Sequence, residues 1–136
     1  MIKSIGAKIY AFWSDRKNSK WIKNPLDSQE KVLKNLIKQG ASTRFGKDHS
    51  FEEIKDSRSF RELIPIRDYE DLRPYIDLIL DGGKDILWPG RPLYYAKSSG
   101  TTSGAKFIPI TKASMPQHIR AAREALLNYI YLTGNT

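Results

Sequence analysis

The recurrence of hydrophobic residues at the start of the chain predicts an amphipathic helix over residues 1–24. Its apolar positions, which recur at helical spacing, are Ile2, Ile5, Ile9, Phe12 and Trp13. Asn24-Pro25 predicts a break after this helix. Because amphipathic helices mostly face a core, we expect this apolar stripe to dock on the rest of a larger protein.

A second helix is predicted from about Ser28 to Thr43. Its apolar face consists of Val32, Leu33, Leu36 and Ile37. Asp27 has the place of an N-cap, and Glu30 completes a capping box with it. Gly46 is predicted to be the C-terminal stop of this helix.

Two further helices are predicted in the polar region that follows. Ser59 and Glu62 form a capping-box pattern that opens a short helix, and this helix ends before Pro65. Asp68 is predicted to cap the next helix. Pro74 is expected to separate a first turn at residues 69–72 from a main helix, which the glycines after Asp81 terminate.

The last third of the chain predicts a strand, a loop, a second strand and a helix. After an extended piece at 86–88 and a turn at 89–92, the strands are expected at about 93–97 and 107–110. The final helix starts near Ser114 in a capping pattern, and Gly134 closes it. We therefore expect a helix-rich α/β fold with a small strand–loop–strand unit. The expected organisation is one partial domain: a leader helix (1–24), a helical region (25–92) and a strand–loop–strand–helix part (93–136).

Positive charge is concentrated at one end of the chain. The net charge is +8, and the first 24 residues hold six basic residues against one acidic residue. A basic amphipathic helix suits an anionic membrane surface, so peripheral membrane contact by residues 1–24 is the alternative to docking. No apolar run is long enough to span a membrane, and no nucleic-acid-binding signature accompanies the basic patch, so no nucleic-acid partner is expected. The absence of cysteine fits a reducing compartment, and we expect a cytoplasmic location.

The loop between the two predicted strands has the composition of an anion-binding site. Gly100 and Gly104 let the backbone turn so that successive N–H groups face one point, and Lys106 adds a positive charge. The candidate hydroxyl donors are Ser98, Ser99, Thr101, Thr102 and Ser103. The spacing is not that of a Walker A motif, which needs four residues between its glycines and a hydroxyl residue after its lysine. The expected ligand is the phosphate tail of a nucleotide, and the alternative is a polar hairpin loop without a ligand.

No residue is predicted to be catalytic, and no metal site is predicted. His49 and His118 lie far apart and lack a second histidine at ligand spacing, so we expect surface or satisfied side chains. Ser98 and Ser99 have no histidine nearby in the sequence that would activate either of them as a nucleophile.

The loop and its flanks resemble the phosphate-binding motif of adenylate-forming enzymes. The resemblance is to the auxin-responsive Gretchen Hagen family of acyl-acid amido synthetases. It rests on the doubled serine at 98–99, the inserted Ser103 and the Lys-Phe-Ile-Pro-Ile-Thr exit at 106–111, with further blocks at 51–54, 60–66, 69–76 and 87–90. The resemblance covers roughly residue 28 to the end. Members of the family are several times longer, so it implies that the chain corresponds to their N-terminal part.

This resemblance implies an ATP-dependent ligase that adenylates a carboxylic acid and conjugates it to an amine or amino acid. It implies ATP, with Mg²⁺ on its phosphates, bound by the loop and Lys106. It also implies that the C-terminal remainder of the enzyme is missing from this chain and that the chain alone is inactive. Two alternatives stay open, namely a carboxylate–CoA ligase of the same superfamily and a truncated, non-catalytic protein that binds a nucleotide or a partner.

Overall fold

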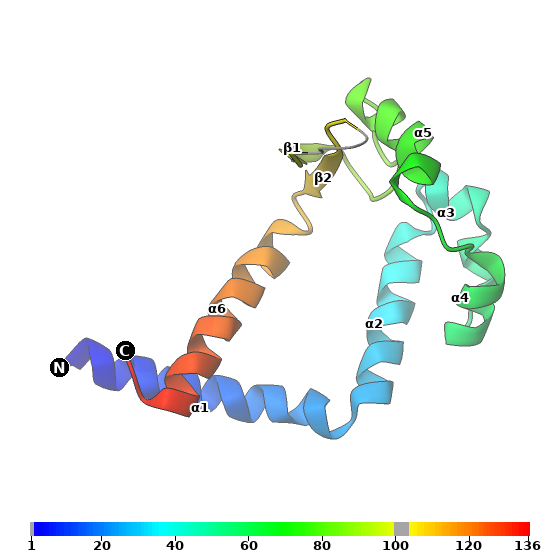
Figure 1. The fold of residues 1–136 in the computed structure, drawn as a ribbon. Coiled ribbons are helices and arrows are strands. Elements are labelled where there is room, and N and C mark those ends of the chain that lie inside the picture. The colour runs from blue at the N-terminus through cyan, green and yellow to red at the C-terminus, as the bar shows by residue number, and fades with distance from the viewer. Residues whose placement is uncertain (1, 100–103) are drawn as a thin grey trace. The chain divides into compact units, whose positions relative to one another are not determined.

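The computed structural model describes residues 2–99 and 104–136 as a helix-rich α/β structure with one two-stranded sheet (Figure 1). Its elements, in chain order, are α1 (Ile2–Lys23), α2 (Pro25–Gly40), α3 (Arg44–Asp48), a 3-10 turn η1 (Phe51–Glu53), α4 (Ser57–Leu63), α5 (Tyr69–Leu80), β1 (Pro92–Lys97), β2 (Phe107–Thr111) and α6 (Met115–Thr133). The chain divides into two compact units, one formed by Met1–Ser28 with Ala113–Thr136 and the other by Gln29–Lys112. Among the described residues, no helix is both long and apolar enough to cross a membrane.

In the first unit, α1 packs on α6 through small side chains. Ala11, which is 1% exposed, forms a buried cluster with Leu127 and Ile130, and Ala7 packs against it. Alanines at this spacing share one helix face and let a second helix approach closely. The stripe predicted from the sequence lies on another face: Ile5, Ile9 and Trp13 are each more than half exposed. Its docking on another part of a larger protein therefore stays a prediction.

In the second unit, α2 ends earlier than the sequence predicted, and a short turn leads into α3. Thr43 caps α3, because its Oγ1 accepts the Gly46 N–H at 3.0 Å and donates to the Gly40 carbonyl at 2.7 Å. The prediction that Gly46 stops the second helix is wrong, since Gly40 ends α2 and Gly46 lies inside α3. The predicted Asp27 cap is also wrong, because α2 already begins at Pro25, which suits the first helical position.

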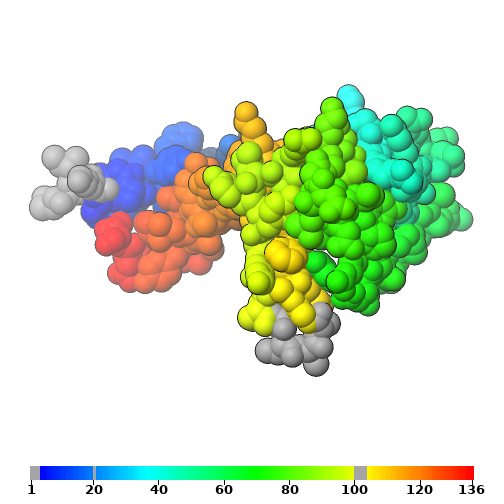
Figure 2. Space-filling model, turned by 90° about the horizontal axis from the view of Figure 1, so that it is seen from above, coloured from blue at the N-terminus to red at the C-terminus, as the bar shows by residue number. Residues whose placement is uncertain are grey.

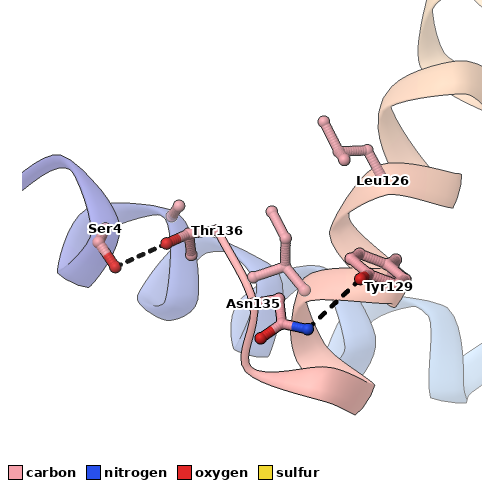
Figure 3. A pocket seen from close by; sticks show the side chains of 7 residues that line it. Ser4, Leu126, Tyr129, Asn135 and Thr136 are labelled. Carbon is pink, nitrogen blue, oxygen red and sulfur yellow. Dashed lines mark hydrogen bonds between the residues drawn. The ribbon is translucent and has the colours of Figure 1, made fainter.

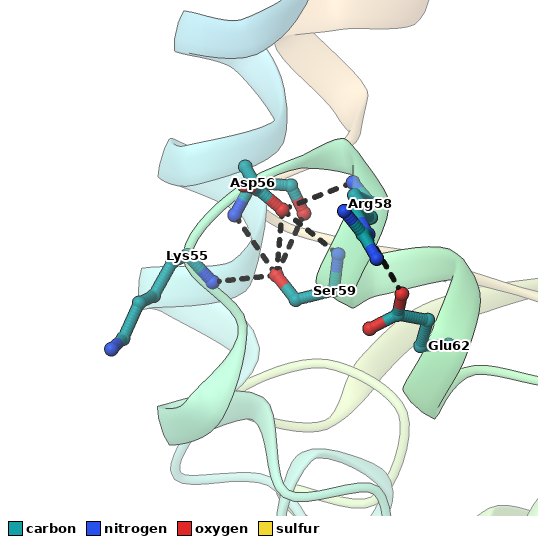
Figure 4. Close-up of polar contacts among 5 residues, drawn as sticks. All are labelled: Lys55, Asp56, Arg58, Ser59 and Glu62. Atoms are coloured by element: carbon teal, nitrogen blue, oxygen red, sulfur yellow. Dashed lines mark hydrogen bonds and ion pairs between the residues drawn. The ribbon is translucent and has the colours of Figure 1, made fainter.

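The structure corrects the predicted cap of α4 and confirms the predicted cap of α5. Asp56, not Ser59, caps α4: its carboxylate accepts the backbone N–H of Ser59 at 2.8 Å, and the Ser59 hydroxyl accepts the Asp56 N–H at 3.1 Å (Figure 4). The Asp68 cap of α5 is confirmed, with Asp71 as its capping-box partner. Pro74 does not separate a first turn, because α5 is continuous from Tyr69 to Leu80.

β1 and β2 form the antiparallel pair that the sequence predicted (Figure 1). β2 contacts α5 (Figure 2). Lys97 faces Phe107 at the loop end, and Tyr95 faces Pro109 further along. The pairing is irregular between Pro92 and Tyr94. The prediction of an extended piece at 86–88 is wrong, since these residues form bends beside α3, whose Phe45 N–H donates to the Ile86 carbonyl at 3.0 Å.

Candidate functional site

The two ends of the candidate loop are joined by a pair of hydrogen bonds. The Ser98 N–H donates to the Lys106 carbonyl at 3.0 Å, and the Lys106 N–H donates to Ser98 Oγ at 3.3 Å. The hydroxyl replaces a carbonyl in the usual antiparallel pair of bonds. This closure fixes the separation of the two ends of the loop, Ser98 and Lys106.

The structure describes four of the eight predicted site residues. Ser98 and Lys106 are half-buried at the loop ends, and Ser99 is exposed. Gly104 is also exposed and has a φ of 82°, a conformation that L side chains rarely adopt. The predicted residues Gly100, Thr101, Thr102 and Ser103 lie outside the described residues.

A residue that sequence reasoning did not single out lies against the loop exit. Tyr69, the first residue of α5, accepts the backbone N–H of Phe107 through its hydroxyl at 2.8 Å. Its ring lies under the ammonium of Lys106, whose Nζ is 5.3 Å from the ring centroid. A cation at this distance is attracted by the negative face of the ring. In the sequence, Tyr69 stands within the resemblance block at 69–76, and hydrophobic spacing gives no signal for a contact across 38 residues.

The donors described around the loop suit an anion better than a metal ion. Hydroxyl, amide N–H and ammonium groups donate hydrogen bonds, whereas Mg²⁺ is bound by oxygen acceptors such as carboxylates. Within the described ranges, 2–99 and 104–136, no group of three or more His, Cys, Asp or Glu side chains could hold a metal ion.

His49 forms a second polar cluster in the same unit. Its ring is 8% exposed, with Nδ1 2.9 Å from the Phe45 carbonyl and Nε2 2.9 Å from Arg67 Nη2. Because a guanidinium can only donate, Nε2 must accept, which places the proton on Nδ1. The prediction that His49 is a satisfied side chain is confirmed.

The ionisable groups beside His49 are held in their ordinary charge states. Burial raises the pKa of the Tyr75 hydroxyl, which donates a 3.0 Å hydrogen bond to Asp48. The hydrogen bond from Arg44 lowers the pKa of the Asp48 carboxyl. At neutral pH the tyrosine stays protonated and the aspartate ionised, so neither group is poised for acid–base catalysis.

A groove in the first unit, between α1 and α6, has no charged lining among the described residues (Figure 3). Its polar side chains bind one another: Ser4 pairs with Thr136 at 2.8 Å, and Asn135 donates to the Tyr129 hydroxyl at 3.4 Å. The remaining lining side chains are those of Ala7, Leu126 and Ile130. None of these described side chains carries a positive charge that would oppose a phosphate.

Comparison with known proteins links this arrangement to a family. A family model described as the GH3 family N-terminal domain matches residues 16–134. Jasmonoyl–L-amino acid synthetase JAR4 of Nicotiana attenuata is 35% identical over 89 residues, which are 64% of this chain and 15% of that protein. Indole-3-acetic acid-amido synthetase GH3.15 of Arabidopsis thaliana is 32% identical over 114 residues, which are 82% of this chain and 19% of that protein.

A solved structure gives the same result at the level of the fold. The AtGH3.15 acyl acid amido synthetase in complex with 2,4-DB superimposes with a TM-score of 0.67 at 28% identity, covering 75% of this chain and 18% of that one. The chain thus spans less than a fifth of the length of these relatives. Since the family model covers most of the sequence, the chain belongs to the GH3 family and corresponds to its N-terminal domain.

Proposed function

We propose that this chain supplies the phosphate-binding loop and N-terminal part of an ATP-dependent, amide-forming ligase. The observation that carries the proposal is the loop closed by Ser98 and Lys106, with its glycines and hydroxyls, in a member of a family whose relatives are named amido synthetases. A cytoplasmic location belongs to the same proposal, since the sequence has no cysteine.

The proposed reaction has two steps. A carboxylate oxygen of the acid attacks the α-phosphorus of ATP and forms an acyl-adenylate, while the bond from the α-phosphorus to its bridging oxygen breaks and pyrophosphate leaves. The nitrogen of an amine or amino acid then attacks the acyl carbon and loses a proton, and AMP leaves with the electrons of the broken C–O bond.

The loop acts by holding phosphates and forms no covalent bond with them. Hydroxyls and N–H groups of residues 98–104 bind the β- and γ-phosphates, and Lys106 opposes their charge as pyrophosphate departs. Fixed donors of this kind lower the barrier by positioning the reactants and by stabilising charge that develops in the transition state. Bound Mg²⁺ would neutralise part of the phosphate charge, with the phosphate oxygens of ATP among its ligands.

The matched part of the relatives is short, so the proposal assigns the remaining chemistry to the rest of such an enzyme. The chain covers 15% and 19% of the two synthetases. Pockets for the adenine, the ribose, the acid and the amine are therefore assigned to that remainder, and we expect the 136-residue chain alone to be inactive.

Acid-dependent exchange of pyrophosphate into ATP tests the proposal. Residues 16–134 would replace the matching segment of a full-length relative, and the chimera would be assayed with a panel of carboxylic acids. We expect pyrophosphate exchange in the chimera. In the same chimera carrying Gly100→Val we expect the rate of exchange to fall by at least about a hundredfold, because the loss of one oxyanion donor costs about that much. Equal exchange in both chimeras would remove this loop from the reaction.

A further inference from the structure

We propose that Tyr69 is a positioning residue for the phosphate loop: it anchors the start of β2 and restrains the side chain of Lys106. This inference rests on the proposed function, because it assigns Tyr69 to the same phosphate site. The role is one of placement, since Tyr69 contacts the loop exit rather than the reacting atoms.

The anchoring contact is made on the outer edge of the hairpin. Ser98 and Lys106 are a hydrogen-bonded pair, and Lys97 and Phe107 are the next pair along the ladder. Antiparallel pairs alternate between hydrogen-bonded and non-hydrogen-bonded, so the Phe107 N–H points away from β1. Tyr69 supplies the acceptor for this outward N–H at 2.8 Å. The backbone at the loop exit is therefore held from both sides, by Ser98 directly after β1 and by Tyr69 on α5.

Tyr69 is itself held firmly enough to act as an anchor. It occupies the first position of α5, directly after the Asp68 cap, and Asp68 and Asp71 complete a capping box there. The far end of α5 is tied to the same sheet, because the Tyr95 hydroxyl donates to the Ile79 carbonyl at 3.2 Å. Two tyrosine hydroxyls thus connect α5 to the hairpin, and the Tyr69 contact is the one beside the loop.

The ring of Tyr69 has a separate effect on Lys106. A lysine side chain has high rotamer freedom, which must be given up when it binds a phosphate. The half-buried Lys106 already rests over the Tyr69 ring, with Nζ 5.3 Å from the centroid. A restrained ammonium loses less entropy on binding, and this is the usual benefit of preorganisation.

Two substitutions separate the hydroxyl from the ring. Tyr69→Phe removes the acceptor for Phe107 and keeps a ring under Lys106, whereas Tyr69→Leu removes both. Tyr95→Phe is the matched control, since it also removes a hydroxyl that ties α5 to the sheet. The probe is inorganic tripolyphosphate, titrated by calorimetry into the 136-residue chain, because it tests the phosphate subsite without an adenine pocket.

For Tyr69→Phe we expect binding about two- to tenfold weaker than wild type, the range for one lost hydrogen bond. Tyr69→Leu should weaken binding further, to about tenfold or more once the cation–π contact is also lost. Tyr95→Phe should stay within about twofold of wild type, although it also loses one hydrogen bond to α5. Amide hydrogen exchange should speed up at Phe107 in both Tyr69 variants and not in Tyr95→Phe.

The outcomes distinguish the two proposals. If wild type binds tripolyphosphate and Tyr69→Phe binds equally well, the positioning role is overturned while the phosphate site stands. Equal weakening by Tyr69→Phe and Tyr95→Phe would also overturn it, because both ties would then act only on stability. If wild type does not bind, the phosphate site is overturned and the role of Tyr69 with it. A measurement on wild type alone guards against variants that fail to fold: saturating tripolyphosphate should shift the ring resonances of Tyr69, and unmoved resonances would contradict the inference.

Discussion

The backbone carbonyl of Gly40 occupies the space that a side chain on Gly46 would need. A Cβ atom built on Gly46 would lie 2.2 Å from the Gly40 oxygen and 3.1 Å from the Ala41 Cα. Both neighbours are backbone atoms, so no side-chain rotation relieves the clash. The chain therefore requires glycine at position 46 because α3 approaches the end of α2 closely.

Gly46→Ala should destabilise the second unit by about 1–3 kcal/mol, the usual cost of forcing extra atoms into a packed site. Gly6→Ala is a matched control, because a Cβ there meets nothing within 4 Å. Alanine in an open helical position should stabilise by about 0.5–1 kcal/mol. Urea unfolding followed by far-UV circular dichroism measures both variants, and unchanged stability of Gly46→Ala would show that the two helices can move apart.

The same glycine shows where sequence reasoning stops. A glycine after an apolar helical face is typical of a helix C-terminus, so the sequence predicts Gly46 as a stop. Its actual role depends on a backbone contact with Gly40, and local sequence does not encode such a contact. The Asp68 cap was predictable, in contrast, because both partners of its box lie within one turn.

The candidate site also has one part that the sequence could identify and one part that it could not. Hydroxyls, glycines and a lysine between two β-prone segments identified the loop, and the strands were placed to within a residue or two. The sequence pattern could not identify Tyr69, because Tyr69 contacts Phe107 only after α5 packs on the sheet. The face of α1 that contacts α6 was also missed, since its alanines contribute little to a hydrophobic pattern.

The buried His49 and the half-buried Arg67 form a pair whose members depend on each other. Arg67 Nη2 donates to His49 Nε2 at 2.9 Å, while Arg67 Nε is buried and has no hydrogen-bond partner among the described residues. His49→Leu would leave a second guanidinium donor without a partner. We expect a loss of about 1–3 kcal/mol in the free energy of unfolding, the usual cost of an unsatisfied buried group.

A double mutant separates this cause from a simple loss of packing. In His49→Leu/Arg67→Leu both partners are replaced by apolar side chains, which is often nearly neutral. The double mutant should therefore be more stable than His49→Leu alone. Additive losses in a double-mutant cycle by urea unfolding would show that the pair is not coupled.

The Ser98 hydroxyl is predicted both to close the loop and to bind the ligand, and one pair of variants can test these roles. Ser98→Ala removes the acceptor for the Lys106 N–H, whereas Ser98→Thr keeps a hydroxyl at that place. One lost hydrogen bond is worth about 0.5–1.5 kcal/mol, so tripolyphosphate should bind Ser98→Ala about two- to tenfold more weakly. Ser98→Thr should bind nearly as wild type does. If calorimetry gives Ser98→Ala the same affinity for tripolyphosphate as wild type, the Ser98 hydroxyl contributes neither to loop closure nor to binding of the ligand.

Glu124 makes the contact between α1 and α6 sensitive to acid. Its carboxylate accepts hydrogen bonds from the Ser14 hydroxyl and, at 3.1 Å, from Asn18 Nδ2, and these bonds lower the pKa of Glu124 below its ordinary value of 4.5. A carboxyl whose pKa is lower in the folded state stabilises the fold above its unfolded pKa, and this stabilisation is lost as the pH falls through the folded pKa. Glu124→Gln should be less stable than wild type at neutral pH, and the difference should disappear as the pH falls below 4.5. Taking the difference between two urea-unfolding series, one for each protein, cancels the titration of the other carboxyls. If the difference in stability between wild type and Glu124→Gln stays constant down to strongly acidic pH, the role of Glu124 is contradicted, because the ionised carboxylate would then not be the group that joins the helices.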